Sequence, residues 1–364
     1  MAFARIDQRE TAPGADGVCV ICPVHNEMLL LPHFLAHHRR LGVTSFVMID
    51  NNSSDGTREY LLTQQDCIVY HTDERYQDAL WGVDWINRIV AQTDYRGWLI
   101  YVDADEHLAY RDMEATPIQG FLRRLSEDGA DTVFGVMVDM YPDGDFLQVG
   151  LEPDSDLHDV LCWFDSDYVL RPWPRRPWDP ATSAYRLQVL GGPRCRLMSN
   201  LQAERRRGAA HYTAMNQVDR FVDLIPSELM PTFARLWPRQ VPAQQKKPIN
   251  LVGPGFRYAN GHSSTNRKIA GETVALLHFK LCHELRRSVR RAETLNGHYR
   301  RGLEQYQLSH AVRRWGDRPL TYAGSRRFRS SRDLESLGLI GDRPAALWRD
   351  GATEVVVGAE PASC

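Results

Sequence analysis

Short apolar runs alternate with segments of helical spacing over the first third of the chain. Apolar residues recur three or four positions apart at 31–41, 57–64 and 77–92. Around these segments lie four runs rich in β-branched and aromatic residues, at 18–22, 45–50, 67–70 and 97–103. The first pattern is typical of helices and the second of buried strands. Strands and helices that alternate at this spacing predict an α/β fold with a mostly parallel central sheet and helices on both faces.

Each of the four predicted strands is followed by a polar cluster. The clusters are 23–27, 50–55, 71–74 and 103–107. In parallel α/β sheets, ligands bind beyond the carboxyl ends of the strands. We therefore expect the functional site at this edge of the sheet.

Two carboxylates directly after the fourth strand are the sharpest chemical feature. Asp103 and Asp105 are two residues apart, so both can be directed at a common point. Oxygen ligands of this kind suit Mg²⁺ or Mn²⁺ bound together with substrate phosphates. The alternative is a polar loop whose carboxylates cap the next element.

The second strand ends in Asp50, within the segment DNNSSDGT. Asp50 can accept hydrogen bonds from a base or a ribose hydroxyl, while Ser53, Ser54 and Asp55 are suited to capping the next helix. Neither G-x-G-x-x-G nor G-x-x-x-x-G-K-[ST] occurs in the sequence, which argues against a dinucleotide oxidoreductase and a P-loop ATPase.

Together, CPVHNE at 22–27, the segment 41–57 ending in DNNSSDGT, and WLIYVDADEHL at 98–108 resemble the nucleotide-sugar glycosyltransferases of the GT-A fold. The similarity is greatest to family 2, in the branch with D-N-x-S-x-D-G-T and D-x-D-E. A weaker resemblance continues through VDMYPDGD, LGGPRCRL and ALLHFKLCHE. It implies a GT-A type α/β domain followed by a C-terminal helical extension.

The resemblance also implies roles for particular residues. Asp103 and Asp105 match the metal-binding pair, with Asp103 also able to reach the ribose. The positions that match the nucleotide-binding side of the family are Pro23, Val24, Asn26, Glu27, Asp50, Asn52 and Asp73. The implied donor is a nucleoside-diphosphate sugar, with a UDP-sugar favoured.

A late apolar run, 274–281, is interrupted by His278 and Lys280. Enzymes of the GT-A fold often supply a late His as a further metal ligand, and a neutral imidazole suits Mn²⁺. Lys280, two residues on, lies on the same face of a strand and can pair with the diphosphate. The alternative for His278 is a core histidine bonded to the backbone, and His262 is a weaker candidate ligand.

The implied reaction is metal-dependent transfer of one sugar to an acceptor hydroxyl, with inversion at C1. The Q-x-x-R-W signature of processive members is absent. The family's usual catalytic base is not recognisable, so the base stays unassigned among Asp139, Asp145, Asp165 and Asp167. The alternatives are a nucleotidyltransferase that makes a nucleotide sugar and an inactive nucleotide-sugar-binding module.

We expect residues 1–110 to form the nucleotide-sugar-binding half of the domain and 111–282 the acceptor-binding half. An irregular or helical insertion is expected around 197–261, and a helical extension and tail over 283–364. The acceptor is expected to be a glycan, a lipid-linked compound or a small molecule.

Composition excludes several classes of protein. With 43% apolar and 25% charged residues among 364, the chain is neither collagen-like nor wholly disordered. No apolar run approaches the roughly 20 residues of a membrane span, and residues 1–17 lack an apolar signal core, so we expect a cytoplasmic protein. The seven scattered cysteines imply no disulfide framework, and Cys19 and Cys22 fit a buried strand.

The near-neutral net charge hides an asymmetry. Residues 94–167 hold 18 acidic and 4 basic side chains, whereas 280–350 hold 16 basic and 8 acidic ones. The basic stretch includes a predicted helix, 283–303, whose basic side is either solvated or docks on an anionic membrane. We find no nucleic-acid-binding module.

Overall fold

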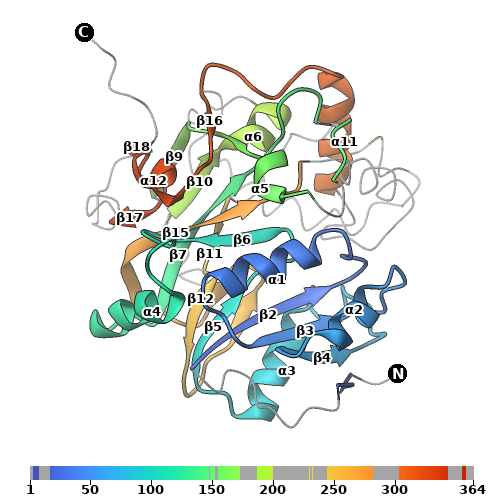
Figure 1. The fold of residues 1–364 in the computed structure, drawn as a ribbon, viewed down its shortest axis with the longest axis vertical. Coiled ribbons are helices and arrows are strands. Elements are labelled where there is room, and N and C mark those ends of the chain that lie inside the picture. The colour runs from blue at the N-terminus through green and yellow to red at the C-terminus, as the bar shows by residue number, and fades with distance from the viewer. Residues whose placement is uncertain are drawn as a thin grey trace.

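The computed structural model describes residues 3–7, 17–146, 148–151, 155–172, 187–199, 229, 232, 244–281, 303–342 and 355–357. The helices are α1 (Leu31–Arg40), α2 (Thr57–Thr63), α3 (Val83–Thr93), α4 (Ile118–Glu127), α5 (Leu157–Val160), α6 (Gly192–Met198), α11 (Leu303–Trp315) and α12 (Ser331–Glu335). Figure 1 shows α1, α2, α3 and α4 beside one large sheet, and α5, α6, α11 and α12 among smaller strands above it.

The large sheet has the strand order β1-β4-β3-β2-β5-β12-β7-β15-β17, with β11 paired to β7 and β6 paired to β15. Its strands are β1 (Ala4–Arg5), β2 (Val18–Val24), β3 (Phe46–Asp50), β4 (Cys67–His71), β5 (Gly97–Tyr101), β6 (Glu106–Ala109), β7 (Thr132–Asp139), β11 (Gln245–Lys246), β12 (Ile249–Val252), β15 (Ile269–His278) and β17 (Gly341–Asp342).

Strands β4, β3, β2 and β5 run parallel, as their alternation with helices predicts. Strand β12 then enters antiparallel between β5 and β7, and β15 returns parallel to β7. The α/β fold with a parallel central portion is confirmed. The antiparallel strand β12 separates the parallel group β4-β3-β2-β5 from the parallel pair β7-β15. Its position depends on pairing with strands that are distant in the sequence.

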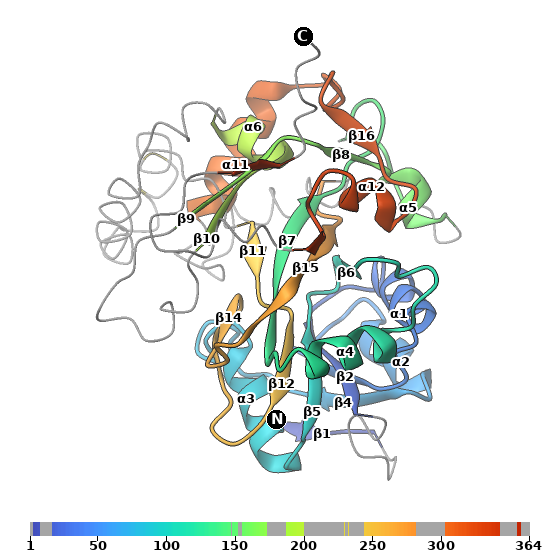
Figure 2. The same ribbon diagram turned by 90° about the vertical axis from the view of Figure 1, so that its left-hand side faces the viewer.

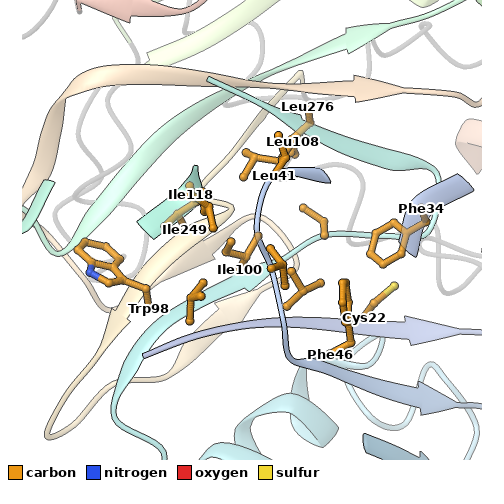
Figure 3. Packing of buried hydrophobic residues seen from close by; sticks show 14 of the residues in the cluster. Cys22, Phe34, Leu41, Phe46, Trp98, Ile100, Leu108, Ile118, Ile249 and Leu276 are labelled. Atoms are coloured by element: carbon orange, nitrogen blue, oxygen red, sulfur yellow. The ribbon is translucent and has the colours of Figure 1, made fainter. Parts of the chain in front are cut away.

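Alternate residues of the central strands face opposite layers of the core. On β2, Val20 and Cys22 belong to the layer beneath α1 and α4, whereas Cys19 and Ile21 belong to the layer beneath α3. Figure 2 shows α1 and α4 on one side of the sheet and α3 on the other. Figure 3 shows the first layer, with Phe34 of α1 among the side chains that the strands contribute. Cys19 and Cys22 are buried free thiols, in agreement with a buried strand.

One predicted helix begins later than its apolar spacing suggests. The pattern predicts a helix over 77–92, but α3 starts at Val83. Leu80 and Trp81 have φ angles of 50° and 56°, and Gly82 has a φ of 81°, so a left-handed turn precedes the helix. A Cβ atom at Gly82 would lie 3.1 Å from Cγ of Pro23, so this turn packs closely on the end of β2.

The second half of the chain builds smaller sheets beside the large one. They comprise β9 (Tyr168–Pro172), β10 (Leu187–Gly191) and β18 (Val355–Val357); β8 (Trp163–Asp165) and β16 (Ser325–Arg327); and β13 (Tyr258–Asn260) and β14 (Ser263–Ser264). Strands from 325–357 thus pair with strands of the middle region, so this part of the chain is not purely helical.

The expected insertion around 197–261 falls largely on 200–243, of which only 229 and 232 are described. Within that range, Gln245–Lys246 and Ile249–Val252 are strands of the large sheet instead. The predicted basic helix over 283–303 lies outside the described residues except for its last residue, Leu303, where α11 begins. Among the described residues, no helix has the length and apolarity needed to cross a membrane.

We expect Phe34→Ala to lower the free energy of unfolding by about 3–5 kcal/mol, because it empties a fully buried position between α1 and the sheet. Chemical denaturation monitored by circular dichroism measures this loss. Leu62→Ala on α2 is the control, since Leu62 is 39% exposed and should change stability by no more than about 0.5 kcal/mol. Equal losses in both variants would contradict the assigned packing.

Candidate functional site

Hydrogen bonds join the loop after β2 to the loop after β3. The amide of Asn26 donates to Ser53 Oγ at 3.0 Å, and the amide of Ser54 donates to Asn26 Oδ1 at 2.7 Å. The amide of Glu27 donates to Thr57 Oγ1 at 2.9 Å. These bonds explain why CPVHNE and DNNSSDGT occur together, since each loop satisfies the other's backbone at the carboxyl edge of the sheet.

Asp50 is fully buried beneath these loops. Its carboxylate accepts a hydrogen bond from the amide of Ser53 at 3.1 Å, and Nδ1 of His71 lies 3.0 Å from its other oxygen. Arg58 lies 3.7 Å from the same oxygen. Asp50 therefore holds the loop and the end of β4, and its contact with a nucleotide stays a prediction.

The other residues predicted on the nucleotide side also lie at this edge. Pro23 and Val24 end β2, while Asn52 and Asp73 are exposed in the loops after β3 and β4. Asn51, between Asp50 and Asn52, donates to the carbonyls of Thr72 and Glu74 at 3.2 and 2.9 Å and joins the two loops.

Asp103, Asp105 and Glu106 form a tight turn between β5 and β6. The amide of Asp103 donates to Glu106 Oε2 at 3.0 Å, and the Glu106 amide returns a bond to the Asp103 carbonyl. The Asp103 side chain is 48% exposed and that of Asp105 is 25% exposed, whereas Glu106 is buried. The turn thus presents the D-x-D pair outward and keeps its Glu inside.

Lys246 of β11 forms ion pairs with two carboxylates of this turn. Its Nζ lies 2.7 Å from Glu106 Oε2 and 3.6 Å from Asp103 Oδ2, and it sits 4.4 Å from the centroid of the Tyr101 ring. Burial lowers the pKa of Lys246, but Asp103 and Glu106 outweigh burial and raise it above the usual range. A charged lysine thus neutralises part of the acidic turn.

His278 lies between two carboxylates. Its Nε2 is 3.3 Å from Asp105 Oδ2, and its Nδ1 is 2.6 Å from Asp139 Oδ1. Strands β7 and β15 end together, and their register pairs Asp139 with His278. Burial lowers the pKa of His278, but the two carboxylates outweigh it and raise the pKa to about 9. The imidazole therefore lies in a strongly negative environment.

Asp139 is held in turn by α6. Nε of Arg194 lies 2.8 Å from Asp139 Oδ2, and Gln244 Nε2 lies 3.5 Å from the same oxygen. Burial alone would raise the pKa of Asp139, but Arg194 and His278 lower it below its usual range. The motif GGPRCR therefore directs Arg194 to a buried carboxylate, and Arg196 likewise pairs with Asp165 at 2.7 Å.

Two of the three predicted metal-binding residues, Asp105 and His278, are in direct contact, and Asp103 lies in the same turn as Asp105. The half-buried Lys280 is close enough that its charge helps to lower the pKa of Asp105, against the effect of burial. His262, the weaker candidate, instead bonds the carbonyl of Gln245 at 2.8 Å.

The donor set fits a divalent cation. Carboxylate and imidazole ligands suit Mn²⁺, and a ligating histidine typically bonds a carboxylate through its other nitrogen. His278 has this arrangement, with Asp139 on Nδ1 and Nε2 directed at Asp105. Asp103, Asp105 and His278 are therefore the residues that would hold such an ion.

The four candidate bases have different surroundings. Asp139 is fully buried and paired as described, and Asp165 is buried between Arg196 and the hydroxyl of Tyr141. Asp145 and Asp167 are half-buried. Tyr322 donates to Asp167 at 3.0 Å. Only the last two carboxylates thus have exposure that an incoming substrate could use.

Sequence reasoning did not find Lys246, Gln244 or the pairing of Asp139 with Arg194. Lys246 stands in QQKKP, a polar segment with no recognisable motif. Its role depends on β11 pairing with β7, a contact between residues more than 100 positions apart. A buried lysine needs a carboxylate partner, but the sequence does not show which lysine is buried.

Comparison with models of protein families finds no match to this sequence, and comparison with curated protein sequences finds none either. Among solved structures, a Bacillus anthracis protein assigned as a glucose-1-phosphate thymidylyltransferase, in complex with a sucrose, shares 9% identity over 37% of this chain, with a TM-score of 0.23. A UDP-glucose pyrophosphorylase from Acinetobacter baumanii shares 8% identity over 37% of this chain, with a TM-score of 0.22. The chain spans 62% and 63% of these proteins, less than two thirds of either.

We expect Lys246→Met to lower the free energy of unfolding by about 3–5 kcal/mol, because it leaves the buried carboxylate of Glu106 without its cation. The double variant Lys246→Met/Glu106→Gln should recover part of this loss, since no fully buried unpaired charge remains; Asp103, which also loses Lys246, is 48% exposed. Arg96→Ala is the control, because its ion pair with Asp94 is exposed and should contribute less than about 1 kcal/mol. A double variant less stable than Lys246→Met would refute the assigned pairing.

Proposed function

We propose that this protein is a metal-dependent glycosyltransferase of the GT-A type, resembling family 2, which transfers one sugar from a nucleoside-diphosphate sugar to an acceptor hydroxyl. The supporting observation is the meeting of Asp105 with His278 at the carboxyl edge of the sheet, with Asp139 bonded to the far side of the imidazole. Any two of these three residues are more than 30 positions apart in the sequence, yet His278 contacts both carboxylates.

The residues of the proposed site have distinct tasks. Asp103, Asp105 and His278 would hold Mn²⁺ or Mg²⁺. When bound, such an ion neutralises the diphosphate and stabilises the charge of the departing nucleoside diphosphate. Asp139 orients His278, and Lys280 provides a further positive charge for phosphate oxygens.

The nucleotide would lie along a strip formed by the loops after β2, β3 and β4, which hydrogen bonds join to one another. Asn26, Glu27, Asn52 and Asp73 border this strip, and UDP is the favoured nucleotide. Acceptor deprotonation needs a carboxylate that the acceptor can reach, which favours Asp145 or Asp167 over the buried candidates. Family resemblance adds inversion at C1 to the proposal.

The rival activity is nucleotidyl transfer, because the two solved structures above are named as enzymes of that kind. Such an enzyme would favour a Gly-rich loop with Lys or Arg after the first strand, whereas here the loop is PVHNE. An inactive nucleotide-sugar-binding module would keep the site but lack turnover. Substrate tests separate the three.

We expect a UDP-sugar to raise the melting temperature of the wild type only when Mn²⁺ is present. Asp105→Asn should abolish this shift, because it removes a charged metal ligand, and Asp94→Asn at an exposed position should retain it. The measurement is a thermal-shift screen of UDP-, GDP-, CMP- and dTDP-sugars. A shift with nucleoside triphosphates instead would favour the nucleotidyltransferase, and binding without turnover would favour the inactive module.

Asp139→Asn should lower kcat for sugar transfer by about 10–100-fold and weaken Mn²⁺ activation, because an amide orients His278 less firmly than a carboxylate does. The readout is the Mn²⁺ concentration for half-maximal activity, with circular dichroism as the check of folding. A folded variant with unchanged Mn²⁺ dependence would argue against His278 as a metal ligand.

A further inference from the structure

A polar groove lies between α1, α5 and the 327–329 segment. It has a volume of about 710 Å³ and is lined by residues of α1, α5, the 111–116 turn and the 327–329 segment. Figure 2 shows α1 and β6 on one side of this region and α5, α12 and β16 on the other. The polar lining residues are His37, Arg40, Glu114, His158, Asp159, Arg327 and Arg329.

Three guanidinium groups in this groove have no bonded partner within the part of the chain that the structure describes. Arg40 ends α1, and Arg327 and Arg329 flank the buried Phe328; all three are exposed. By contrast, Glu114 is engaged, because it accepts bonds from the amide and hydroxyl of Ser331 at 2.7 and 2.6 Å. The groove therefore presents more available positive than negative charge.

The wall of the groove contains stacked histidines. His37, His107 and His158 have ring centroids 4.5–5.3 Å apart and interplanar angles of 17–30°. Burial lowers the pKa of His158 to about 4; Asp156 opposes this shift, and the charge of Arg40 reinforces it. Burial also lowers the pKa values of His37 and His107, so the three imidazoles add no positive charge to the groove at pH 7.

A metal ion fits this cluster less well than an anion fits the groove. The nitrogens of the three imidazoles come within 4.8 Å of one another. However, near-parallel rings point their lone pairs in similar directions and not at one centre. His37 Nε2 is already bonded to the Leu108 carbonyl at 2.8 Å, and His107 Nδ1 to His158 Nε2 at 2.8 Å. Arg40 adds positive charge beside them.

We propose that this groove binds a phosphorylated small molecule, with the phosphate held by Arg40, Arg327 and Arg329. Guanidinium groups bind phosphate oxygens in pairs of parallel hydrogen bonds, so three of them can saturate one phosphate group. Asp159 and His158 supply partners for hydroxyl groups of the ligand, and Leu41, Met113 and Phe328 form an apolar floor.

This inference does not depend on the proposed transfer reaction. The groove contains none of the proposed metal ligands or nucleotide contacts. It is nevertheless adjacent to them, because His158 packs at 5.2 Å against Phe279, the residue after His278. The amide of Phe279 donates to the Asp105 carbonyl at 2.8 Å, which joins the groove wall to the catalytic edge.

The test is isothermal titration calorimetry of the full chain with glucose 6-phosphate and with glucose, in EDTA and at low salt. We expect the phosphate ester to bind and glucose to bind far more weakly. Arg329→Glu should weaken binding of the ester by about tenfold or more, since it removes one cation and adds a repelling charge. Arg96→Glu, an equal charge change at an exposed site near the start of β5, should alter the affinity less than about twofold.

Vesicles containing phosphatidic acid distinguish a lipid phosphate from a soluble one. Binding to vesicles that Arg329→Glu weakens would support the groove with a lipid headgroup as its ligand. Asp105→Asn should bind glucose 6-phosphate as the wild type does, which separates this result from failure of the glycosyltransferase proposal. Equal affinity in the two Arg variants, absence of phosphate binding in both arms, or Zn²⁺ binding lost in His158→Ala without phosphate binding would overturn the proposal.

Discussion

The parallel pairing of β7 with β15 is the constraint on which the candidate site depends. It ends both strands at the same level and sets Asp139 beside His278 in a buried position. A buried carboxylate is costly unless a cation and hydrogen bonds satisfy it. Arg194 from α6 and Gln244 from the segment before β11 meet this requirement, so three distant parts of the chain must be in place before His278 is oriented.

The other half of the site is set by local sequence. The loops after β2 and β3 satisfy each other's amides, and the turn from Asp103 to Glu106 closes on its own backbone. These arrangements need only neighbouring strands in a parallel sheet. The two halves join where β6 pairs with β15, which places Glu106 opposite His278. The loops and the Asp103–Glu106 turn, which local sequence sets, therefore meet Asp139 and His278, which the long-range pairing of β7 with β15 sets.

This division explains what could be predicted from the sequence. Apart from the short edge strand β1, the strands and helices up to Asp105 follow from apolar periodicity, and the edge of the sheet that holds the polar residues follows from parallel topology. The late start of α3 could not be read from spacing, because a left-handed turn at Leu80–Gly82 packs on Pro23. Lys246 and Arg194 were not assigned their partners, since each pairs with a carboxylate more than 50 positions away. Asp139 was among the candidate bases, and its burial between Arg194 and His278 could not be read from the sequence.

The cationic side chains around the site fall into two groups, those paired with buried carboxylates and those close to the more exposed Asp105. Lys246 and Arg194 are buried and saturated by carboxylates, so they stabilise the fold and the orientation of ligands. Lys280 is half-buried and close to Asp105, and the pKa of His278 is raised by the carboxylates on both sides against the effect of burial. The raised pKa of His278 reflects the negative charge of Asp105 beside Nε2 and of Asp139 beside Nδ1. The buried cations thus compensate Glu106 and Asp139 at 2.7 and 2.8 Å, whereas the more exposed Asp103 and Asp105 have longer contacts, to Lys246 at 3.6 Å and to His278 at 3.3 Å. In the proposed function, a divalent cation bound with a diphosphate would complete this partial compensation.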